Sequence, residues 1–371
     1  KKHLDEEGVK YKSISSFSSP TRLAVLITDI PETIKIASKE IKGPKVEVPE
    51  NILNSFMNAH NISKKEVFQK KNEKGNFYFA KIKSKEIIVR DLLIKIILNS
   101  VASLNWQKSM KWADNNLMWG RPLRSILAIF NKKILPFKFA HLKSTDQVIV
   151  EQDLTYKSKQ VKNFSEYKKY LKSFKILLDQ DERKNKIIKK FKYICSTKNF
   201  KEIFNNQLIE EVSNIVENPN ILLIEFNKKY LEIPNEIIIS TLESHQRYFP
   251  LFDSRDRLTN NFLVVANKSD TKNLIRDGNK RVVEARLSDA KFFWDKDKSR
   301  NLIKQIGKLK KIIFYDKIGT VYDKTIRLRK LAGLISDELN INKENLQIAA
   351  SISKSDLCSD LVGEYPELQG V

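Results

Sequence analysis

The chain has 371 residues, of which 41% are hydrophobic, and its formal net charge is +23 at pH 7. This length predicts two or three domains of roughly 100–200 residues each, with enough apolar side chains for packed cores. The positive charge predicts attraction to polyanions that weakens as salt rises. A competing interpretation is that Lys, Asn and Ile are abundant because the genome is AT-rich, so that much of the Lys excess is background.

Cysteine usage and hydropathy exclude several classes of protein. Cys195 and Cys358 are far apart, with no CxxC pattern and no neighbouring His, which excludes a disulfide scaffold or zinc knuckle and fits a reducing compartment. No run of about 18 apolar residues is present, so no membrane span is expected. We therefore predict a cytoplasmic protein. Because the chain begins at Lys1 rather than Met and stops at Val371, we expect a piece of a longer protein.

The first part of the chain predicts mixed α and β structure. A short apolar run at residues 21–27 predicts a strand, and residues 67–69 and 77–82 predict a hairpin around a turn that ends at Gly75. Apolar residues at three- and four-residue spacing predict a helix over residues 89–104. Residues 125–130 predict another strand. The polar, poorly patterned segment 131–162 is expected to be a loop-rich connection.

The middle of the chain continues this mixture. Residues 165–194 are expected to form a helix, a short strand at 174–178 and a second helix. A strand is expected at 221–226, a helix from Pro234 to His245, and a hairpin from strands 247–252 and 261–266. From residue 300 onward every segment reads as helical, namely 302–314, 322–339 and 344–361. We therefore place a domain boundary near residue 300.

The scarce arginines are concentrated in residues 243–300. About half of them lie there, among aromatic residues, whereas Lys dominates elsewhere. Guanidinium groups bind phosphate and stack on bases better than ammonium groups do, so this composition favours an RNA-binding surface. The alternative is a solvated rim around a small core. The arginines are Arg247, Arg255, Arg257, Arg276, Arg281, Arg286 and Arg300.

No catalytic constellation is visible in the sequence. The four histidines are isolated, and there is no GxGxxG, P-loop or GxSxG pattern. Gly278-Asn279, expected just before the helix of Arg281, could offer backbone N–H groups to one phosphate. Asp356, Asp360 and Glu364 could share a helix face as metal ligands, but Gly363 and Pro366 argue that the helix ends there, which favours capping and solubility.

Several motifs, in a consistent order, resemble the beta subunit of the bacterial heterotetrameric glycyl-tRNA synthetases over nearly the whole chain. They are Ser19-Pro20-Thr21-Arg22-Leu23-Ala24-Val25-Leu26, Lys108-Ser109-Met110-Lys111-Trp112, Arg121-Pro122-Leu123-Arg124, His245-Gln246-Arg247-Tyr248-Phe249-Pro250, Ala285-Arg286-Leu287-Ser288-Asp289-Ala290-Lys291-Phe292-Phe293 and Val362-Gly363-Glu364-Tyr365-Pro366-Glu367-Leu368-Gln369-Gly370. Two sites depart from the family pattern. Glu217-Asn218-Pro219 lacks the usual Trp between Glu and Pro, and Ala140-His141-Leu142-Lys143 replaces a GHRF-like stretch.

The resemblance implies an α+β fold. Residues 1–299 would form a mixed α/β region resembling a B3/B4-type module, and residues 300–371 the truncated start of an all-helical, HD-like domain. A metal site of the usual HD type is not expected, because no His follows His245 and the matching place reads Lys354-Ser355-Asp356.

The resemblance also implies a subunit of glycine–tRNA ligase that binds tRNA(Gly) and assembles with a catalytic alpha subunit into a tetramer of two alpha and two beta subunits. ATP and Mg would be used by the alpha subunit, and this chain would bind no cofactor. The alternatives are an editing-type deacylase module and a purely structural docking subunit. The candidate nucleic-acid-binding residues are Arg247, Arg276, Arg281, Arg286, Lys291, Arg121 and Arg124.

The same motif residues also have a structural interpretation. His245 and Gln246 could cap the helix before them, and Arg286 could pair with Asp289 one turn along its own helix.

Overall fold

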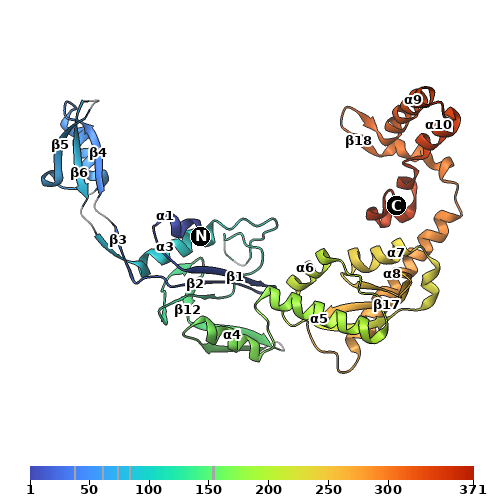
Figure 1. The fold of residues 1–371 in the computed structure, drawn as a ribbon, viewed down its shortest axis with the longest axis horizontal. Helices are drawn as coiled ribbons and strands as arrows, with labels where there is room; N and C mark the ends of the chain where they lie inside the picture. The colour runs from blue at the N-terminus through green and yellow to red at the C-terminus, as the bar shows by residue number, and fades with distance from the viewer. Residues whose placement is uncertain are drawn as a thin grey trace. The chain divides into compact units, whose positions relative to one another are not determined.

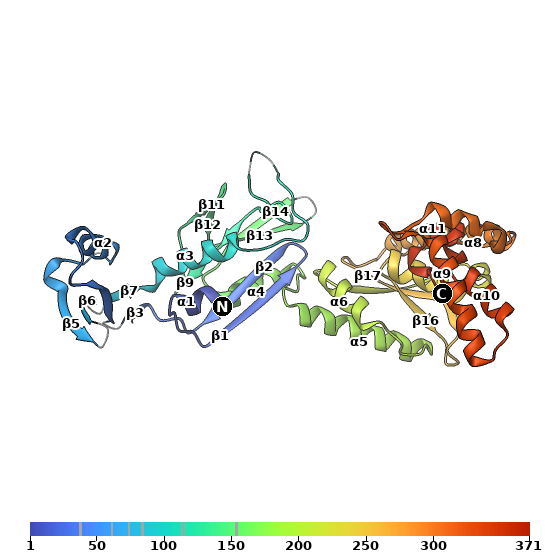
Figure 2. The same ribbon diagram turned by 90° about the horizontal axis from the view of Figure 1, so that it is seen from above.

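The computed structural model describes the chain except for residues 37–38, 61, 73–74, 83–84, 113, 115 and 153–154. It divides into two compact units (Figures 1 and 2). The first unit contains Lys1–Phe17 and Leu23–Phe174, and the second contains Ser18–Arg22 and Lys175–Val371. The short segment Ser18–Arg22, at the tip of the N-terminal hairpin, therefore belongs to the second unit. The expected boundary near residue 300 falls inside that unit.

The first unit consists of small, mostly antiparallel sheets with a few helices. Its helices are α1 (Lys2–Glu6), α2 (Glu50–His60), α3 (Val89–Ala102) and α4 (Phe164–Ser173), with a 3-10 turn at Lys64–Glu66. Its strands are β1 (Ser13–Ser19), β2 (Arg22–Thr28), β3 (Thr33–Ile36), β4 (Lys39–Lys45), β5 (Val67–Asn72), β6 (Gly75–Ile82), β7 (Lys85–Ile88), β8 (Ile126–Leu127), β9 (Ile129–Phe130), β10 (Lys133–Ile134), β11 (Lys138–Phe139), β12 (Leu142–Thr145), β13 (Gln147–Gln152) and β14 (Thr155–Gln160).

The strand expected at 21–27, the hairpin and the long helix are confirmed as β2, as β5 paired with β6, and as α3. The apolar spacing that predicted α3 buries Val89, Leu93 and Ile96 on one face of the helix. These three side chains form a core cluster with Leu4 and Leu135. The 3.6-residue period therefore located the core of this unit correctly.

One prediction for the first unit is confirmed in part, and one is wrong. The expected strand 125–130 is split into β8, which pairs in parallel with β12, and β9, which pairs with β10. The expected loop 131–162 contains the strands β10 to β14. The sequence did not indicate β14 as a strand, because its side chains are polar and exposed along its whole length. In its partner β13, Val148 and Val150 are buried. In a two-stranded ribbon of this kind the backbone N–H and C=O groups pair between the strands, and the outer strand needs no alternating apolar residues to do so.

The second unit has a three-layer core around an antiparallel sheet. The strand order is β15-β17-β16, where β15 is Asn220–Glu225, β16 is Phe249–Phe252 and β17 is Leu258–Ala266. Side chains alternate between the two faces, which are both apolar. Helices α7 (Asn235–Ser240) and α8 (Leu274–Lys298) contribute to the core on one face. Helices α5 (Gln180–Lys198) and α6 (Asn206–Ile215) contribute to the core on the other.

Most predictions for this region are confirmed, with two corrections. Residues 174–178 form no strand, although the Leu177 N–H donates to the carbonyl of Glu217 at 2.9 Å. The helix expected to end at His245 is confirmed, and its last turn, η3 (Thr241–His245), is π-helical. Gly278 lies inside α8, which begins at Leu274, so the expected phosphate cradle at a helix start is absent from this position.

The segment beyond residue 300 is not all-helical. It contains η4 (Leu302–Lys311), α9 (Val321–Leu339), α10 (Lys343–Ile352), η5 (Ser355–Cys358), α11 (Asp360–Glu364) and η6 (Pro366–Leu368), but also a hairpin of β18 (Ile313–Tyr315) and β19 (Gly319–Thr320). β-branched and aromatic residues favour the strand β18 where a helix was expected. Among the described residues, no helix is long and apolar enough to cross a bilayer.

The C-terminal turns join the core of the second unit. Leu361, Tyr365 and Leu368 are buried in the same cluster as α7 and α8. The helix expected over residues 344–361 is interrupted after Ile352, and α11 begins only at Asp360. Asp356 and Asp360 therefore lie on different helices and do not form the acidic face that the spacing allowed.

Candidate nucleic-acid interface

Helix α8 carries the densest group of candidate cations. Val283, Leu287 and Ala290 bury one face of this helix against the sheet. Arg281 and Arg286 lie on the exposed part of the helix surface. Within the described part of the chain, Arg281 has no carboxylate oxygen within 4.0 Å, so its guanidinium is available to a ligand.

Arg247 serves the fold. Its backbone φ is +59°, in the left-handed region, at the end of the η3 turn. Its Nε donates to Glu211 Oε1 at 2.5 Å, and its Nη1 donates to the carbonyls of Glu243, at 3.2 Å, and Ser244. Carbonyls at the end of a helical turn lack backbone partners, and a cation there satisfies them. This guanidinium is therefore engaged inside the protein.

The side chains of Arg276 and Lys291 also bind other groups of the protein. Arg276 Nη1 donates to the side chain of Asn273 at 3.0 Å, one turn back along the chain. Lys291 Nζ lies 3.3 Å from a carboxylate oxygen of both Asp295 and Glu232. Hydrogen bonds to Asp295 and then Glu232 raise the pKa of Lys291. Lys291 is thus partly neutralised by carboxylates, whereas Arg276 keeps its charge but donates one hydrogen bond to a protein amide.

Gln246 lies at the C-cap of η3, as expected, and its backbone N–H donates to the carbonyl of Glu243. His245 and Arg286 instead contact the C-terminal turns. His245 Nε2 lies 2.7 Å from Glu367 Oε1, and its ring lies 4.9 Å from the ring of Tyr365. The ion-pair partner of Arg286 is Glu364, at 4.0 Å, and not the expected Asp289. The His245 motif therefore connects two segments of the second unit that are distant in sequence.

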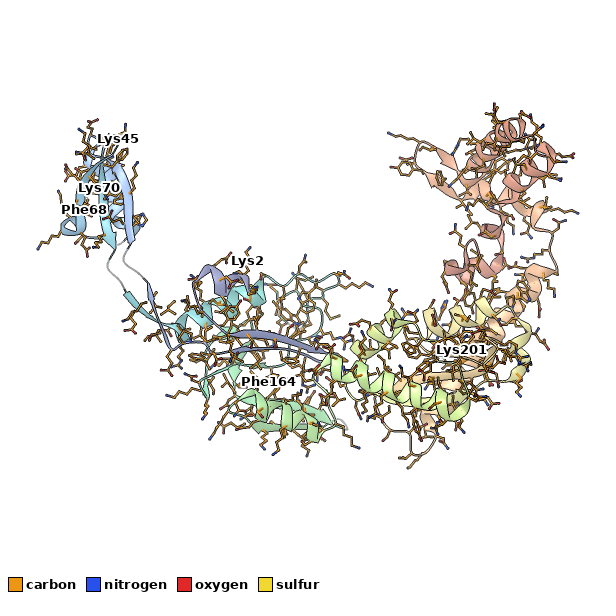
Figure 3. All side chains as sticks on the ribbon, in the orientation of Figure 1. Lys2, Lys45, Phe68, Lys70, Phe164 and Lys201 are labelled. Atoms are coloured by element: carbon orange, nitrogen blue, oxygen red, sulfur yellow. The ribbon has the colours of Figure 1, made fainter. Side chains whose placement is uncertain are left out.

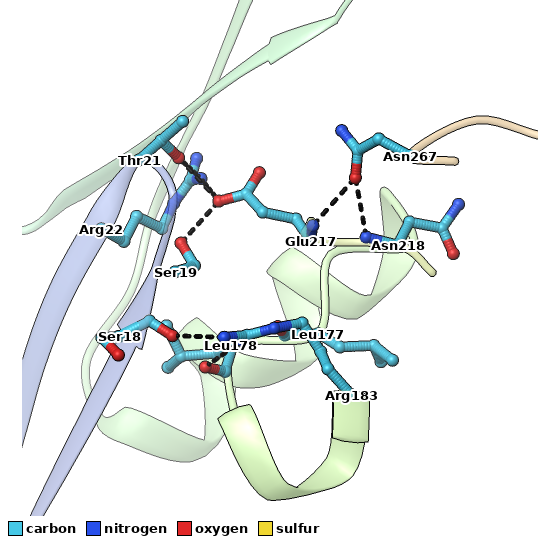
Figure 4. A network of polar contacts seen from close by, with 10 residues as sticks. All are labelled: Ser18, Ser19, Thr21, Arg22, Leu177, Leu178, Arg183, Glu217, Asn218 and Asn267. Carbon is cyan, nitrogen blue, oxygen red and sulfur yellow. Dashed lines mark hydrogen bonds and ion pairs between the residues drawn. The ribbon is translucent and has the colours of Figure 1, made fainter. Parts of the chain in front are cut away.

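Arg183 is the most deeply buried cation and was not predicted. It is fully buried and donates four hydrogen bonds to backbone carbonyls, as Figure 4 shows in part. Nε donates to Ser213 at 2.7 Å, Nη1 to Leu177 at 2.8 Å and to Leu178 at 2.9 Å, and Nη2 to Ser18 at 2.8 Å. Burial lowers the pKa of Arg183. A guanidinium remains charged even so, and each bond is charge-assisted.

Glu217 binds the same hairpin tip from the other side. Its Oε1 accepts hydrogen bonds from Ser19 at 2.6 Å, Thr21 at 2.7 Å and Arg22 at 3.0 Å (Figure 4). Its own N–H donates to Asn267 Oδ1 at 2.8 Å. We call Ser18–Arg22, Arg183 and Glu217 the hairpin clasp. Sequence motifs flagged both Thr21-Arg22 and Glu217, but their partnership spans 195 to 198 residues and carries no local signal.

The two candidate cations in the first unit, Arg121 and Arg124, differ in whether they bind other protein groups. Arg124 Nη1 donates to Glu151 Oε2 at 3.0 Å and to the Tyr156 hydroxyl at 2.6 Å, so it is occupied on the β13–β14 ribbon. Arg121 is exposed. Among the seven candidates, Arg121 and Arg281 are the two exposed guanidinium groups that, within the described residues, have no carboxylate partner.

The described residues show little that could perform small-molecule chemistry. No group of three or more His, Cys, Asp or Glu side chains among them could hold a metal ion. A pocket of about 230 Å³, lined by residues that include Phe204, Glu243 and Phe249, is smaller than the roughly 300–1,000 Å³ of most ligand pockets. A second pocket, of about 660 Å³, is lined only by α9, through Leu334, Ile335, Asp337, Glu338 and Leu339, and no group of described side chains from several elements converges on it. Cys195 and Cys358 are buried free thiols, and burial raises the pKa of Cys195 to about 11. A protonated thiol of this kind is a poor nucleophile.

Comparison with known proteins gives one consistent result. The profile of the family described as "Glycyl-tRNA synthetase beta subunit" matches residues 1–371. The chain is 34% identical over 369 residues to the glycine–tRNA ligase beta subunit of Rickettsia felis, and 36% identical over 368 residues to that of Rickettsia prowazekii. Each match covers 99% of this chain and 55% of the relative. The chain therefore spans about half the length of the curated relatives it matches.

Proposed function

The chain belongs to the glycyl-tRNA synthetase beta subunit family, and from this membership we propose that it works within a glycine–tRNA ligase. Its role there is to bind tRNA(Gly) and to assemble with an alpha subunit, in a tetramer of two alpha and two beta subunits. The observation that carries the proposal is the family match over residues 1–371.

The charge distribution supports the RNA-binding part of this role. The net charge of +23 attracts a polyanion. Arg281 and Arg121 offer exposed guanidinium groups, whereas Arg247, Arg276, Lys291 and Arg124 already bind protein groups. The candidate set thereby narrows to Arg281 and Arg121, with Arg286 as a weaker third because its acidic partner lies at 4.0 Å.

We assign the chemical step to the alpha subunit. ATP and Mg are used there in this proposal, and this chain holds no cofactor. The beta chain contributes affinity for tRNA and the assembly surface, and its location is the cytoplasm, where charged tRNA is consumed. Residues 1–299 correspond to a B3/B4-like module and residues 300–371 to the beginning of an HD-like domain in the same proposal.

The test is tRNA(Gly) binding by the chain at several salt concentrations. Replacing Arg281 and Arg286 together with Gln should weaken binding and reduce the salt dependence. The slope should fall by about 0.9 for each phosphate that is no longer neutralised, if duplex RNA behaves like duplex DNA. The matched control is Arg257→Gln, which removes an arginine already bound to Asp253 at 2.8 Å.

The outcomes separate the alternatives. Unchanged affinity and slope in the double variant would remove this part of α8 from the RNA-binding surface. If the double variant instead fails to assemble with the alpha subunit while binding tRNA normally, the docking hypothesis replaces RNA binding for this surface. Release of a non-cognate amino acid from mischarged tRNA by this chain alone would favour the editing alternative.

A further inference from the structure

One face of the small sheet formed by β4, β6 and β5 gathers phenylalanine and lysine side chains. Directly opposed residues of an antiparallel sheet share a face, as do alternate residues along a strand. By this rule the strand register places eight residues together, and Figure 3 labels three of them, Lys45, Phe68 and Lys70. The face, here called the Phe–Lys face, consists of Glu40, Lys42, Lys45, Phe68, Lys70, Phe77, Phe79 and Lys81.

The aromatic part of this face is open to solvent at one edge. Phe68 is 38% exposed although its side chain is apolar. The rings of Phe68 and Phe79 are stacked, with centroids 6.2 Å apart and an interplanar angle of 26°. Phe77, next along β6, is buried. The face therefore presents an exposed ring that is supported by a second ring from the neighbouring strand.

Lysine ammonium groups surround these rings. Lys42 Nζ lies 3.5 Å from the centroid of the Phe77 ring, and Lys70 Nζ lies 5.5 Å from that of Phe79. Lys70 also binds Glu40, with Nζ 3.0 Å from Oε2. Such contacts between a cation and a ring hold the lysine side chains over the sheet instead of extended into solvent.

The charge on the face is strongly positive. It has four lysines and one glutamate, and that glutamate neutralises Lys70. Lys42, Lys45 and Lys81 are exposed, and within the described residues none has a carboxylate oxygen within 4.0 Å. Like charges gathered on one face repel one another, and a bound anion relieves that repulsion.

The opposite face of the sheet is already covered by α2 (Figure 2). Ala80 on that face is fully buried, and Leu53 of α2 is buried at 6% exposure. A Cβ added at Gly43 would meet the Phe56 ring at 2.8 Å, so the helix packs closely against this side. The small sheet therefore has its core on one side and leaves the Phe–Lys face as its open side.

We propose that the Phe–Lys face binds unpaired nucleotides of an RNA, with a base stacked on Phe68 and phosphates contacted by Lys42, Lys45 and Lys81. This inference rests on the RNA-binding function proposed above and assigns it a second, separate contact site. Aromatic rings on a sheet with flanking cations are the combination by which proteins hold single strands, because every base has a stacking face and every nucleotide carries a phosphate.

Charge complementarity favours RNA over a protein occupant. A protein segment on this face would have to bring carboxylates to three lysines and an apolar or aromatic group to Phe68, whereas each unpaired nucleotide supplies an anion and a planar ring together. The strongest alternative is nevertheless a protein segment, and the experiment below distinguishes it.

The experiment measures binding of tRNA(Gly) transcript and of a short oligouridylate to the 371-residue chain. Phe68→Leu keeps an apolar side chain and removes the ring, so both affinities should fall about fivefold or more, with the salt slope unchanged. Lys42→Gln with Lys81→Gln should reduce the slope for oligouridylate by about 1.4, at roughly 0.7 per phosphate on a single strand. Glu40→Gln frees Lys70 and should strengthen binding, a gain that misfolding cannot produce.

The matched control is Tyr193→Leu on α5, an exposed ring with Lys190 Nζ 4.5 Å from its centroid, which should leave both affinities unchanged. If the unmodified chain binds tRNA and the Phe68 and Glu40 variants bind as it does, the inference is wrong while the proposed function stands. If the unmodified chain does not bind tRNA, the proposed function itself fails. A photoreactive residue at position 68 that crosslinks to protein instead of RNA would also overturn the inference.

Discussion

Replacing Glu217 tests whether the hairpin clasp holds Ser18–Arg22 in the second unit. The change Glu217→Ala removes the single oxygen that accepts from Ser19, Thr21 and Arg22, at 2.6, 2.7 and 3.0 Å. Glu217→Gln keeps an oxygen at that place but removes its charge. The two variants thus separate the loss of the acceptor from the loss of the charge.

The expected size follows from the hydrogen bonds. Hydrogen bonds to charged groups contribute about 1.5 kcal/mol or more each, so three would contribute about 4.5 kcal/mol if fully shielded from water. The Glu217 side chain is 12% exposed, so water can replace part of this contribution. We therefore expect Glu217→Ala to reduce the local free energy of opening by about 2–3 kcal/mol, and Glu217→Gln by about 1 kcal/mol.

The assay is native-state hydrogen exchange read on peptides that cover residues 18–22 and 217–218. A local measurement is needed because a chain with two units need not unfold in one cooperative step. The control is Glu210→Ala, which removes an exposed ion pair with Lys184 and should change stability by less than about 0.5 kcal/mol. Exchange in Glu217→Ala that is as slow as in this control would refute the clasp as a stabilising interaction.

Three further predictions concern single sites. Ala140 has φ +51°, a backbone conformation that suits Gly, so Ala140→Gly should raise the free energy of unfolding of its region by about 0.5–1 kcal/mol in urea titration. Cys195, with a pKa of about 11, should resist iodoacetamide at pH 8 until the second unit unfolds, and rapid alkylation of the folded chain would contradict its burial. The hydrogen bond from Lys296 lowers the pKa of Asp360 in the folded chain. The ionised Asp360 therefore stabilises the fold above the pKa of an unfolded Asp, near 4, and this stabilisation is lost as the pH falls through the lower pKa of the folded state. Asp360→Asn should therefore lower stability at pH 7 and flatten its decline in acid, as followed by thermal unfolding between pH 2 and 7.

Local pattern in the sequence located the elements that build the cores. The spacing of Val89, Leu93 and Ile96 predicted α3, and short apolar runs predicted the strands that the structure shows as β15 and β17. It failed for the polar strand β14, whose partner β13 supplies the pairing that its own residues do not signal. It failed also for β18, where a helix was expected although the residue types favour a strand. A strand is stabilised by the strands beside it, so the sequence of a polar edge strand need not show the two-residue apolar period that predicts a strand.

The arginines show a second limit of the sequence. Their concentration between residues 243 and 300 indicated an RNA-binding surface, but it could not separate Arg281, which is exposed, from Arg247, whose guanidinium binds Glu211 and two carbonyls. A cation has the same residue type in either role, and only the position of its acceptors distinguishes the two.

By itself the sequence determined the family, through motifs in a consistent order, and most of the core helices and strands, through apolar periods that each element carries within its own residues. The tertiary structure decided which cations are available, how Ser18–Arg22 is held by Arg183 and Glu217, and which open face joins Phe68 to lysines. The physical reason is the sequence separation over which each kind of interaction acts. An apolar period acts within one element, whereas a hydrogen bond or ion pair depends on two groups that the fold brings together from up to 198 residues apart.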